Sequence, residues 1–572
     1  MNSKIKINRK FLSKDLIIST WESVQPYYEQ LISHQPANQN DFLQWFGRSN
    51  ELEAALQEHY AWLYIRMTCN TLDKEIATTY SNFVQHVKPK VIEYQQQLTQ
   101  KYYHSPFRNE LNPDTFKLIN WVASVEIELY RADNVPILSE IDLETQQYDA
   151  LIGAMTIEVD NQTLTLPQAA LQLEITDRNK RETVWKKLSA RRLHDKDVLD
   201  TLFNKLINLR QQVAKNANYQ SFTDYQFKNL ARIDFTKKDC LDFQTAIEKV
   251  VKPLYIQLMN HRKKALNLSQ LRPWDTAVDL YGTEPLRPFK DDKELITKAL
   301  QLFHSIRPEL ATMVKQLQDL QQLDLASHIG KAPGGYNYPL YETGVPFIFM
   351  NAAGAHQDLI TLIHECGHAI HSIVTADLQY NTHKSPPSEV AELASMSMEY
   401  IAQDYLQIFY PSPKDQQRAL YQQLSRTIIL LPWIALVDAF QQWIYDNPTH
   451  SISQRCQQWT TLYYRFHGDA VDWSGFETEL SYLWQKQQHI FDVPFYYIEY
   501  GIAQLGALQV WQNFQQNPQL AIDNYLKALK LGYTQTPSQI YKTAGITFSL
   551  SEQTIQHLFS FLNEKISGLQ VG

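Results

Sequence analysis

Apolar residues recur at helical spacing over long stretches of this 572-residue chain, and few glycines or prolines interrupt them. Between residues 10 and 147, segments such as DFLQWFGRSNELEAALQEHYAWLYIRMTCN place apolar side chains on one helical face. The whole chain has 17 glycines and 24 prolines, too few for a loop-rich protein. We therefore expect a predominantly α-helical fold.

Two short segments depart from helical spacing and predict β-structure. Residues 155–166, MTIEVDNQTLTL, alternate apolar and polar side chains around Asp160 and Asn161, which suit a tight turn. A later glycine-rich segment, GKAPGGYNYPLYETGVPFIFMNAAGAHQD, contains an apolar run at residues 345–350. That run predicts a short strand. We therefore expect a β-hairpin after the first helical lobe and a small sheet further along the chain.

The charge pattern argues against nucleic acid as a partner. The 61 acidic and 53 basic residues give a net charge of -8 and are interspersed, with no basic block that would neutralise phosphates. The first residues lack the apolar segment of a secretory signal, and no stretch is expected to reach membrane-spanning length.

The cysteines indicate the compartment. Cys69, Cys240, Cys366 and Cys456 are scattered along the chain and do not resemble a disulfide framework. We therefore expect a cytoplasmic protein with no membrane partner. The sequence does not predict its oligomeric state.

A candidate metal motif lies in residues 359–373, LITLIHECGHAIHSI, whose apolar residues are at helical spacing. His364 and His368 are one turn apart on one face, so both imidazoles can bind one zinc ion. Glu365 is offset by about 100° around the helix, close enough to act as a base toward a water on the metal. The alternative is a helix whose histidines only pack in the core.

A catalytic zinc site needs a third protein ligand. The candidates are Glu389, Glu392 and Glu399 in the segment SEVAELASMSMEY, which has helical character. Glu392 and Glu399 lie two turns apart on one face, so one can bind zinc while the other orients a ligand histidine. Spacing alone does not separate Glu389 from Glu392. The alternative, a solvated acidic helix face, is disfavoured by the small and apolar residues between the carboxylates.

Two further residues of the motif helix are expected to have supporting roles. Cys366 is about 200° around the helix from His364 and should point into the protein behind the metal face. His371 follows on the ligand side one turn after His368. Because three protein ligands suffice for a catalytic zinc, we expect His371 to orient a ligand or to be structural.

Several segments together resemble the thimet oligopeptidase and oligoendopeptidase F family of zinc metallopeptidases, and the oligoendopeptidase branch most closely. They run over most of the chain after about residue 150: NANYQSFTDYQFKNLARIDFT (216–236), LRPWD (271–275), GKAPGGY (330–336), FIFMN (347–351), HECGH (364–368), EVAELAS (389–395) and HIFDVPFYYIEYGIAQLGALQVW (489–511). Before residue 150 the resemblance is limited to a helical lobe that ends in a hairpin.

The resemblance implies a predominantly helical fold whose two halves enclose a deep substrate groove, with one zinc ion per chain. It also implies that the third ligand is Glu392, the glutamate of the run ELAS, and that the substrates are short peptides. We accordingly expect an N-terminal helical lobe over residues 1–185, ending in the hairpin, and a zinc metallopeptidase domain over residues 186–572.

The family also uses a late histidine and tyrosines to bind the reacting carbonyl. In this chain the corresponding segment contains His489, Tyr496, Tyr497 and Tyr500. If residues 494–511 form one helix, Tyr496 and Tyr500 share a face and Tyr497 is displaced. The alternative is that these hydroxyls point into core crevices.

These features predict a zinc endopeptidase that cleaves internal bonds of oligopeptides. Glu365 would take the proton of a zinc-activated water and pass it to the leaving amine. The strand containing Phe347 and Phe349 would bind the substrate by β-pairing. The glycines before this strand would allow close backbone approach, or would serve ordinary turns: Gly330, Gly334 and Gly335.

Two other functions are consistent with parts of the sequence. An exopeptidase such as a dipeptidyl carboxypeptidase would use the same metal chemistry, but it needs a charged anchor for a peptide terminus, and we identify none. A non-catalytic, zinc-containing peptide-binding protein is disfavoured because structural zinc sites usually close the fourth position with Cys or His.

Overall fold

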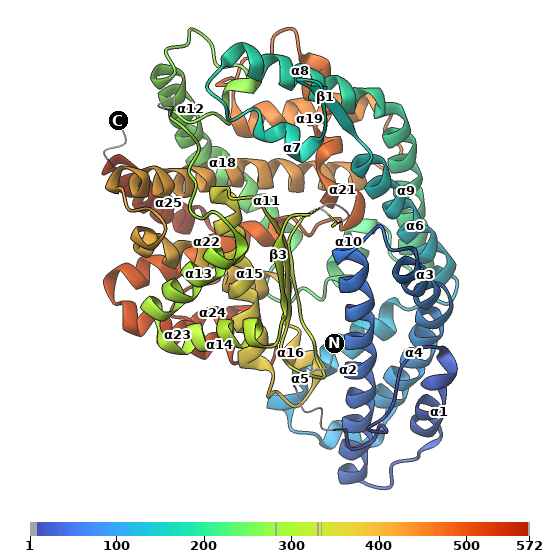
Figure 1. Cartoon of the computed structure of the whole chain (residues 1–572). Coiled ribbons are helices and arrows are strands. Elements are labelled where there is room, and N and C mark those ends of the chain that lie inside the picture. The colour runs from blue at the N-terminus through green and yellow to red at the C-terminus, as the bar shows by residue number, and fades with distance from the viewer. Residues whose placement is uncertain (1–8, 281–282, 329–330, 333, 570–572) are drawn as a thin grey trace. The chain divides into compact units, whose positions relative to one another are not determined.

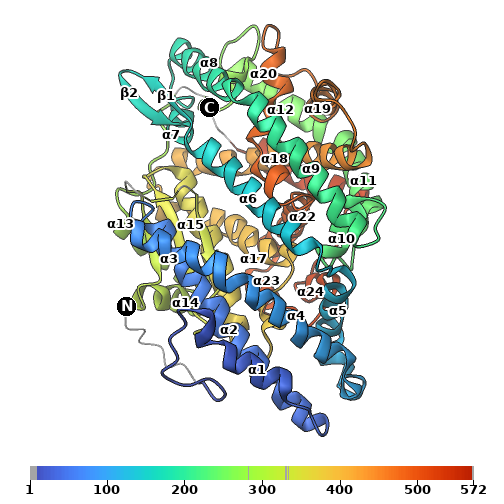
Figure 2. The same cartoon turned by 90° about the vertical axis from the view of Figure 1, so that its right-hand side faces the viewer.

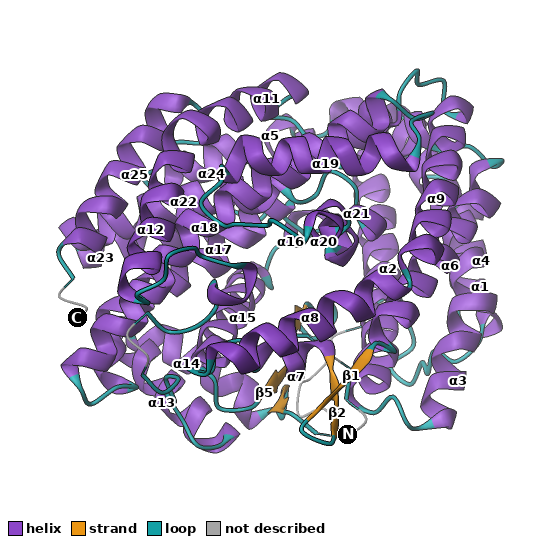
Figure 3. Cartoon of the chain, turned by 90° about the horizontal axis from the view of Figure 1, so that it is seen from above, coloured by secondary structure: helices purple, strands orange, loops and turns teal. Residues whose placement is uncertain are grey.

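The structure is a computed structural model that describes residues 9–280, 283–328, 331–332 and 334–569. Helices predominate, and the strands of the described residues form one two-stranded and one three-stranded sheet (Figure 3). The predicted helical fold class is confirmed. The chain divides into two compact units, and the predicted boundary between residues 185 and 186 stays a prediction. The first unit contains residues 1–128, 287–413 and 506–548, and the second contains residues 129–286, 414–505 and 549–572.

The first unit combines three separate stretches of chain. Its elements are α1 (Gln25–Ser33), α2 (Gln39–Cys69), α3 (Lys74–Asn82), α4 (Lys88–His104), α5 (Pro113–Leu129), α13 (Asp292–Ile306), α14 (Pro308–Asp319), β3 (Leu323–Ala326), β4 (Tyr336–Tyr338), β5 (Phe347–Ala352), α15 (His356–Thr375), α16 (Asn381–Lys384), α17 (Ser388–Ile401), α23 (Pro518–Leu529) and α24 (Pro537–Thr543). A further helix, α22 (Ile498–Gln516), contributes residues to both units.

The three-stranded sheet has the order β3-β5-β4, with β5 parallel to β3 and antiparallel to β4. The predicted strand at residues 345–350 is present as β5, shifted by two residues. Phe347 and Phe349 are buried and pack with Ala61 and Ile65 of α2. Because β5 is the central strand, its backbone pairs with a neighbour on both sides.

Helix α15 follows the sheet directly and packs against β5, β4 and α17. Figure 1 shows α15 beside the sheet, which is labelled there at β3. Gly354, two residues before the first residue of α15, has φ +97°, a left-handed conformation that favours glycine. The Asp358 carboxylate then accepts the backbone N–H groups of Ala353 at 2.7 Å and Ala355 at 2.9 Å. These bonds satisfy backbone donors at the start of the helix. The predicted helix over residues 359–373 is therefore confirmed.

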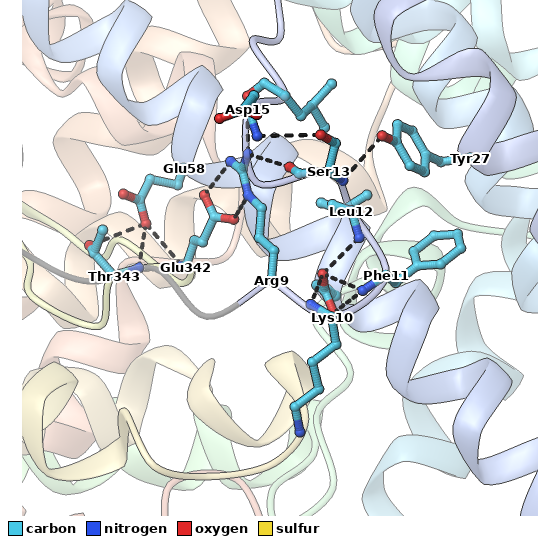
Figure 4. Close-up of polar contacts among 12 residues, drawn as sticks. Arg9, Lys10, Phe11, Leu12, Ser13, Asp15, Tyr27, Glu58, Glu342 and Thr343 are labelled. Atoms are coloured by element: carbon cyan, nitrogen blue, oxygen red, sulfur yellow. Dashed lines mark hydrogen bonds and ion pairs between the residues drawn. The ribbon is translucent and has the colours of Figure 1, made fainter.

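An N-terminal arm is tied to the first unit by charged hydrogen bonds (Figure 4). The Glu51 carboxylate of α2 accepts the backbone N–H groups of the arm at residues 10–12. The Arg9 guanidinium donates to both carboxylate oxygens of Glu342 at 2.6 and 3.0 Å. Glu58 of α2 in turn accepts the N–H groups of Glu342 and Thr343. The arm and α2 therefore hold the turn between β4 and β5.

The second unit is also discontinuous. Its elements are α6 (Asn134–Gly153), β1 (Thr156–Val159), β2 (Gln162–Thr165), α7 (Leu166–Leu171), α8 (Arg178–His194), α9 (Lys196–Asn216), α10 (Phe222–Asn229), α11 (Lys237–Ala246), α12 (Lys252–Ala265), α18 (Pro413–Asp446), α19 (Ile452–His467), α20 (Glu477–Ser481), α21 (Gln488–Asp492), α25 (Glu552–Ser567) and part of α22.

The predicted hairpin is present in the second unit. Strands β1 and β2 pair antiparallel, with Thr156 opposite Thr165. Asp160 and Asn161 have φ angles of 51° and 61°. Two left-handed residues are the requirement of a type I′ turn, and Asp and Asn tolerate that conformation. Figure 2 shows the hairpin beside α7 and α8, which pack on it.

Helix α18 reaches membrane-spanning length, contrary to the expectation from the sequence. Among the described residues, this one helix is long and apolar enough to cross a membrane, with a mean hydropathy of 1.4 over its most apolar window. Within the structure, 78% of that window is buried. Because a core helix passes the same test, α18 is weak evidence for a membrane span.

Candidate metal centre

The two motif histidines project from the same face of α15. Their ring centroids are 4.8 Å apart, with an interplanar angle of 84°. His364 donates its Nδ1–H to Glu399 Oε1 of α17 at 2.7 Å, which leaves Nε2 available. His368 makes its own hydrogen bond to the backbone of Ala391. Two imidazoles are thus held in fixed orientations one turn apart.

Glu392 on α17 faces both histidines. Its Oε2 lies 3.5 Å from Nε2 of His364 and 3.7 Å from Nε2 of His368. The Ser395 hydroxyl, one turn further along α17, shares its proton between the same oxygen at 3.2 Å and the Glu392 backbone carbonyl at 3.0 Å. Within the described part of the chain, His364, His368 and Glu392 form the group whose ligand atoms lie within 4.8 Å of one another. Glu389, the other candidate, is not in this group.

The geometry of these three atoms fits a zinc ion. Zinc bonds of about 2.0–2.2 Å in a tetrahedral arrangement place neighbouring ligand atoms about 3.4 Å apart. The distances of 3.5 and 3.7 Å around Glu392 are close to that value. Two imidazoles and one carboxylate are also the donor set of a catalytic zinc site, which leaves a fourth position for water.

Charges around His364 favour a cation between the three ligands. Burial lowers the pKa of His364, but the hydrogen bond to Glu399 and the charge of Glu392 outweigh it and raise the pKa to about 9. The carboxylates therefore attract positive charge to this position. A metal ion would compete with the imidazole proton for the same nitrogen.

Glu365 lies beside the ligands without joining them. Glu365 is 6% exposed, and its carboxylate accepts a hydrogen bond from the backbone N–H of Asn337 in β4. Burial raises the pKa of Glu365 to about 7, against the opposing effect of His364. A carboxylate with a pKa near neutrality can both accept and return a proton.

Cys366 and His371 occupy the interior of the first unit. Cys366 is fully buried, as its position behind the metal face predicts. His371 is 4% exposed and hydrogen-bonds to the backbone of Leu529 in α23. This contact is structural, because it joins two packed helices.

The structure contradicts the predicted role of β5 in substrate binding. Phe347 is 4% exposed, Phe349 is fully buried, and β3 and β4 occupy both edges of the strand. Neither the side chains nor the backbone of these two residues can reach a substrate. The apolar run that predicted the strand did not reveal that β5 lies between two others.

The glycine-rich loop before β4 is only partly described. Gly330 lies outside the described residues. Gly334 has φ +94°, and its carbonyl accepts a hydrogen bond from the Asn351 side chain at 3.1 Å. A Cβ on Gly335 would approach the Thr361 methyl to 3.2 Å. These two glycines therefore serve a turn and a close approach to α15, and a substrate contact stays a prediction.

In the second unit, the late histidine and tyrosines form one aromatic cluster. The ring centroid of His489 is 4.9 Å from that of Tyr497, 5.6 Å from that of Tyr500 and 6.1 Å from that of Tyr496. Helix α22 begins only at Ile498, so the predicted helix from residue 494 is wrong at its start. Tyr497 is consequently a member of the cluster and is not displaced from it.

Comparison with known families decides the relationship. The family described as "Peptidase family M3" matches residues 171–559 of this chain. The domain family described as "Peptidase M3 N-terminal domain" matches residues 15–130. The chain belongs to peptidase family M3. The predicted resemblance is thereby confirmed.

Individual M3 relatives are distant in sequence. The chain is 24% identical over 331 residues to oligopeptidase PepF of Bacillus subtilis (strain 168), covering 56% of this chain and 47% of that protein. It is 24% identical over 322 residues to the chromosomal oligoendopeptidase F of Lactococcus lactis subsp. cremoris, covering 56% and 52%. The alignments thus span about half the length of these relatives.

The fold is shared with a solved peptidase structure. A structure of PZ peptidase A with an inhibitor matches with a TM-score of 0.92 at 23% sequence identity. The match covers 98% of this chain and 100% of that one. The helical architecture of the M3 chain is therefore that of a known peptidase.

Sequence reasoning missed two residues at the candidate metal centre of this M3 chain. A Cβ on Gly367 would lie 2.6 Å from the Cα of Ser395, so only glycine allows α15 to approach α17 this closely. A lone glycine inside the apolar motif helix was a usable signal of such packing. Asn337, whose N–H binds Glu365, could not be found, because a backbone contact leaves no signature in residue type.

The segment that carries the aromatic cluster is fixed by buried polar contacts within the second unit. Phe495 has φ +67°; its N–H donates to Gln441 Oε1 at 2.8 Å, and its carbonyl accepts a hydrogen bond from Arg232. Arg232 also pairs with Glu499 at 3.0 Å, and its guanidinium lies 4.3 Å from the ring centroid of Phe227. Arg232 therefore ties the left-handed turn to the first residues of α22.

Proposed function

We propose that the chain is a zinc-dependent endopeptidase that hydrolyses internal peptide bonds of short oligopeptides, with one zinc ion per chain. The observation that carries the proposal is the convergence of His364, His368 and Glu392 within 4.8 Å, with Glu365 beside them on the same helix. Family membership supports a peptidase, and this donor set supports a catalytic metal over a structural one.

Each residue of the proposed centre would have a distinct role in the hydrolysis. Zinc, when bound, lowers the pKa of a water molecule and polarises the scissile carbonyl. Glu365 takes the proton of the attacking water and returns it to the leaving amine. The N–H of Asn337 holds the Glu365 carboxylate in place. Glu399 keeps the His364 ring in the tautomer that leaves Nε2 free.

We propose that the substrate pairs with β4 and not with β5. Among the described strands, β4 (Tyr336–Tyr338) is an edge strand, and the N–H of its central residue Asn337 reaches Glu365. An extended peptide that adds to a free strand edge gains backbone hydrogen bonds with little dependence on its side chains. We propose that such pairing brings the scissile bond toward Glu365.

The role of the aromatic cluster rests on the family resemblance. There, a histidine and tyrosines bind the reacting carbonyl, and we carry that role to His489, Tyr496, Tyr497 and Tyr500. Hydroxyl and imidazole donors are suited to stabilise a developing oxyanion.

We also propose a cytoplasmic location, supported by the four cysteines, which are all free.

Hydrolysis of an internally quenched peptide blocked at both ends tests the proposed function. An endopeptidase cleaves this peptide, and removal of zinc by a chelator abolishes the cleavage. An exopeptidase cleaves only the matching peptide with a free terminus. A zinc-containing binding protein cleaves neither, although it retains the metal.

A further inference from the structure

A cavity of about 270 Å³ lies in the second unit, and all of its lining residues belong to that unit. Its walls come from the β-hairpin region, α7, α8, α9 and the segment after α19. Most of the lining is apolar and includes Leu166, Trp185, Leu188, Leu193 and Trp473. A cavity of about 150 Å³ with such a lining already admits a benzene-sized molecule. This cavity is therefore large enough for a small ligand.

Two cationic side chains line the same cavity. Arg192 is in the last turn of α8, and Lys486 follows α20. The Arg192 side chain makes no hydrogen bond or ion pair with any residue that the structure describes, and burial lowers its pKa. By contrast, its neighbour Arg191, which does not line the cavity, pairs with Asp195 at 2.5 Å.

The two cations interact unfavourably with each other. Burial of the ammonium group, and then the charge of Arg192, lowers the pKa of Lys486 to about 8, although the residue as a whole is exposed. An anion near both groups would relieve this repulsion and supply the acceptors that Arg192 lacks. Glu479 is the acidic residue of the lining, so the cavity keeps a net positive charge.

We propose that this cavity binds a monocarboxylate with an apolar tail, such as a medium-chain fatty acid or the C-terminus of a small apolar peptide. The carboxylate would accept hydrogen bonds from the Arg192 guanidinium, which suits bidentate recognition. The tail would fill the space between Trp185, Leu188 and Trp473. The metal ligands belong to the first unit, so the proposal is independent of the proposed peptidase function.

Calorimetric titration of the full-length, zinc-loaded protein with decanoate tests the proposal. We expect saturable binding that weakens at least tenfold in Arg192→Gln and in Ala170→Phe, which fills the cavity, but not in Arg191→Gln. Binding should persist in Glu392→Ala, which excludes a carboxylate held by the metal. 1-Decanol should bind at least tenfold more weakly than decanoate, because it lacks the carboxylate.

A parallel titration with an N-acetylated apolar dipeptide distinguishes the two sources of ligand, since the tighter ligand identifies the class. Melting curves of each variant without ligand establish that it folds. Arg192→Gln should keep its rate on the blocked peptide. The proposal is overturned if neither carboxylate binds saturably, or if binding is undiminished in both Arg192→Gln and Ala170→Phe. Equal affinity for 1-decanol would overturn the role of the two cations.

Discussion

At the scale of single residues, the proposed metal centre depends on side chains that hold the proposed ligands as much as on those ligands themselves. Glu399 accepts a hydrogen bond from His364 at 2.7 Å, and Ser395 donates to the Glu392 oxygen that faces both histidines. Such contacts set the tautomer and orientation of a ligand before the metal binds. Removing one of these contacts should therefore weaken zinc binding.

Replacing Glu399 with alanine should weaken zinc binding by about 10- to 100-fold, the usual effect of losing a partner of a ligand histidine. The His364 ring then loses the acceptor that fixes its Nδ1–H. Glu399→Gln, which still accepts a hydrogen bond but carries no charge, should lose less. Competition with a chelator of known affinity measures both. Wild-type affinity in the alanine variant would contradict the role of Glu399.

Asp438 is a second residue whose charge state matters, and it lies in the second unit. It is fully buried, and its Oδ2 accepts hydrogen bonds from Gln244 at 2.7 Å and Gln442 at 2.8 Å, while Oδ1 has no partner. Burial raises its pKa from 3.8 to about 6. Between these two values the folded protein keeps a proton that the unfolded chain has released.

The free energy of unfolding should therefore fall as pH rises from about 4 to about 6, and the contribution of Asp438 is fully lost above its folded pKa. A difference of about two pKa units corresponds to about 3 kcal/mol at most. Asp438→Asn cannot ionise, so its stability relative to the wild type should rise by about 1–3 kcal/mol across this range. Urea unfolding at several pH values measures the difference.

Asp446→Asn is the matched control, because Asp446 is on the same helix but its side chain is 45% exposed and pairs with Lys237. Its stability relative to the wild type should change little over the same range. A pH-independent difference for Asp438→Asn would show that Asp438 does not retain its proton in the folded protein.

At the scale of elements, the site requires α15 and α17 to lie unusually close. Gly367 permits this contact, since an added Cβ would lie 2.6 Å from the Cα of Ser395 and 2.9 Å from the carbonyl of Ala394. Both obstacles are backbone atoms and cannot rotate away. Further support comes from the third stretch of the first unit, where the Tyr525 hydroxyl donates to the same carbonyl at 2.9 Å.

Gly367→Ala should therefore push α17 away and separate Glu392 from the two histidines. We expect zinc affinity to fall by at least tenfold and stability to fall by about 1–3 kcal/mol, as for an overpacked core. Gly47→Ala is the control: Gly47 lies in α2 with nothing within 4 Å of an added Cβ. That variant should gain up to about 1 kcal/mol and keep its zinc. Unchanged zinc affinity in Gly367→Ala would refute the steric argument.

The Arg232 contacts give a prediction for the aromatic segment. Arg232→Lys should lose the paired hydrogen bonds to the Phe495 carbonyl and Glu499, each worth about 1.5–3 kcal/mol for a charged group. Hydrogen exchange of residues 494–500 should then accelerate about tenfold or more, and kcat should fall because the tyrosines lose their fixed positions. Zinc affinity should not change. Unaltered exchange in this segment would contradict the positioning role.

At the scale of the whole molecule, the sequence predicted the elements better than their arrangement. Helical periodicity predicted α15, and the turn residues Asp160 and Asn161 predicted the hairpin, because these signals are local. The order of the sheet is set by pairing between distant segments, so the central position of β5 was not predictable. The start of α22 was misplaced because the left-handed conformation of Phe495 depends on Gln441 and Arg232.

The proposed metal ligands were predictable for a different reason. The spacing of His364, Glu365 and His368 is dictated by the chemistry itself, since two ligands and a base must share one helix. The choice of Glu392 over Glu389 needed the family resemblance, and the structure brings Glu392 to the histidines. The contacts of Gly367 and Asn337 depend on packing between elements, so they could not be predicted from the spacing of residues in the sequence.

The most direct test of the account measures zinc content and hydrolysis of the doubly blocked peptide in two variants, Glu365→Gln and Glu392→Ala. We expect Glu365→Gln to retain about one zinc per chain while its rate falls by about 10²–10⁴, the contribution of a general base. Glu392→Ala should lose both tight zinc binding and hydrolysis. Turnover near the wild-type rate in Glu365→Gln, or full zinc retention in Glu392→Ala, would contradict the proposed metal centre.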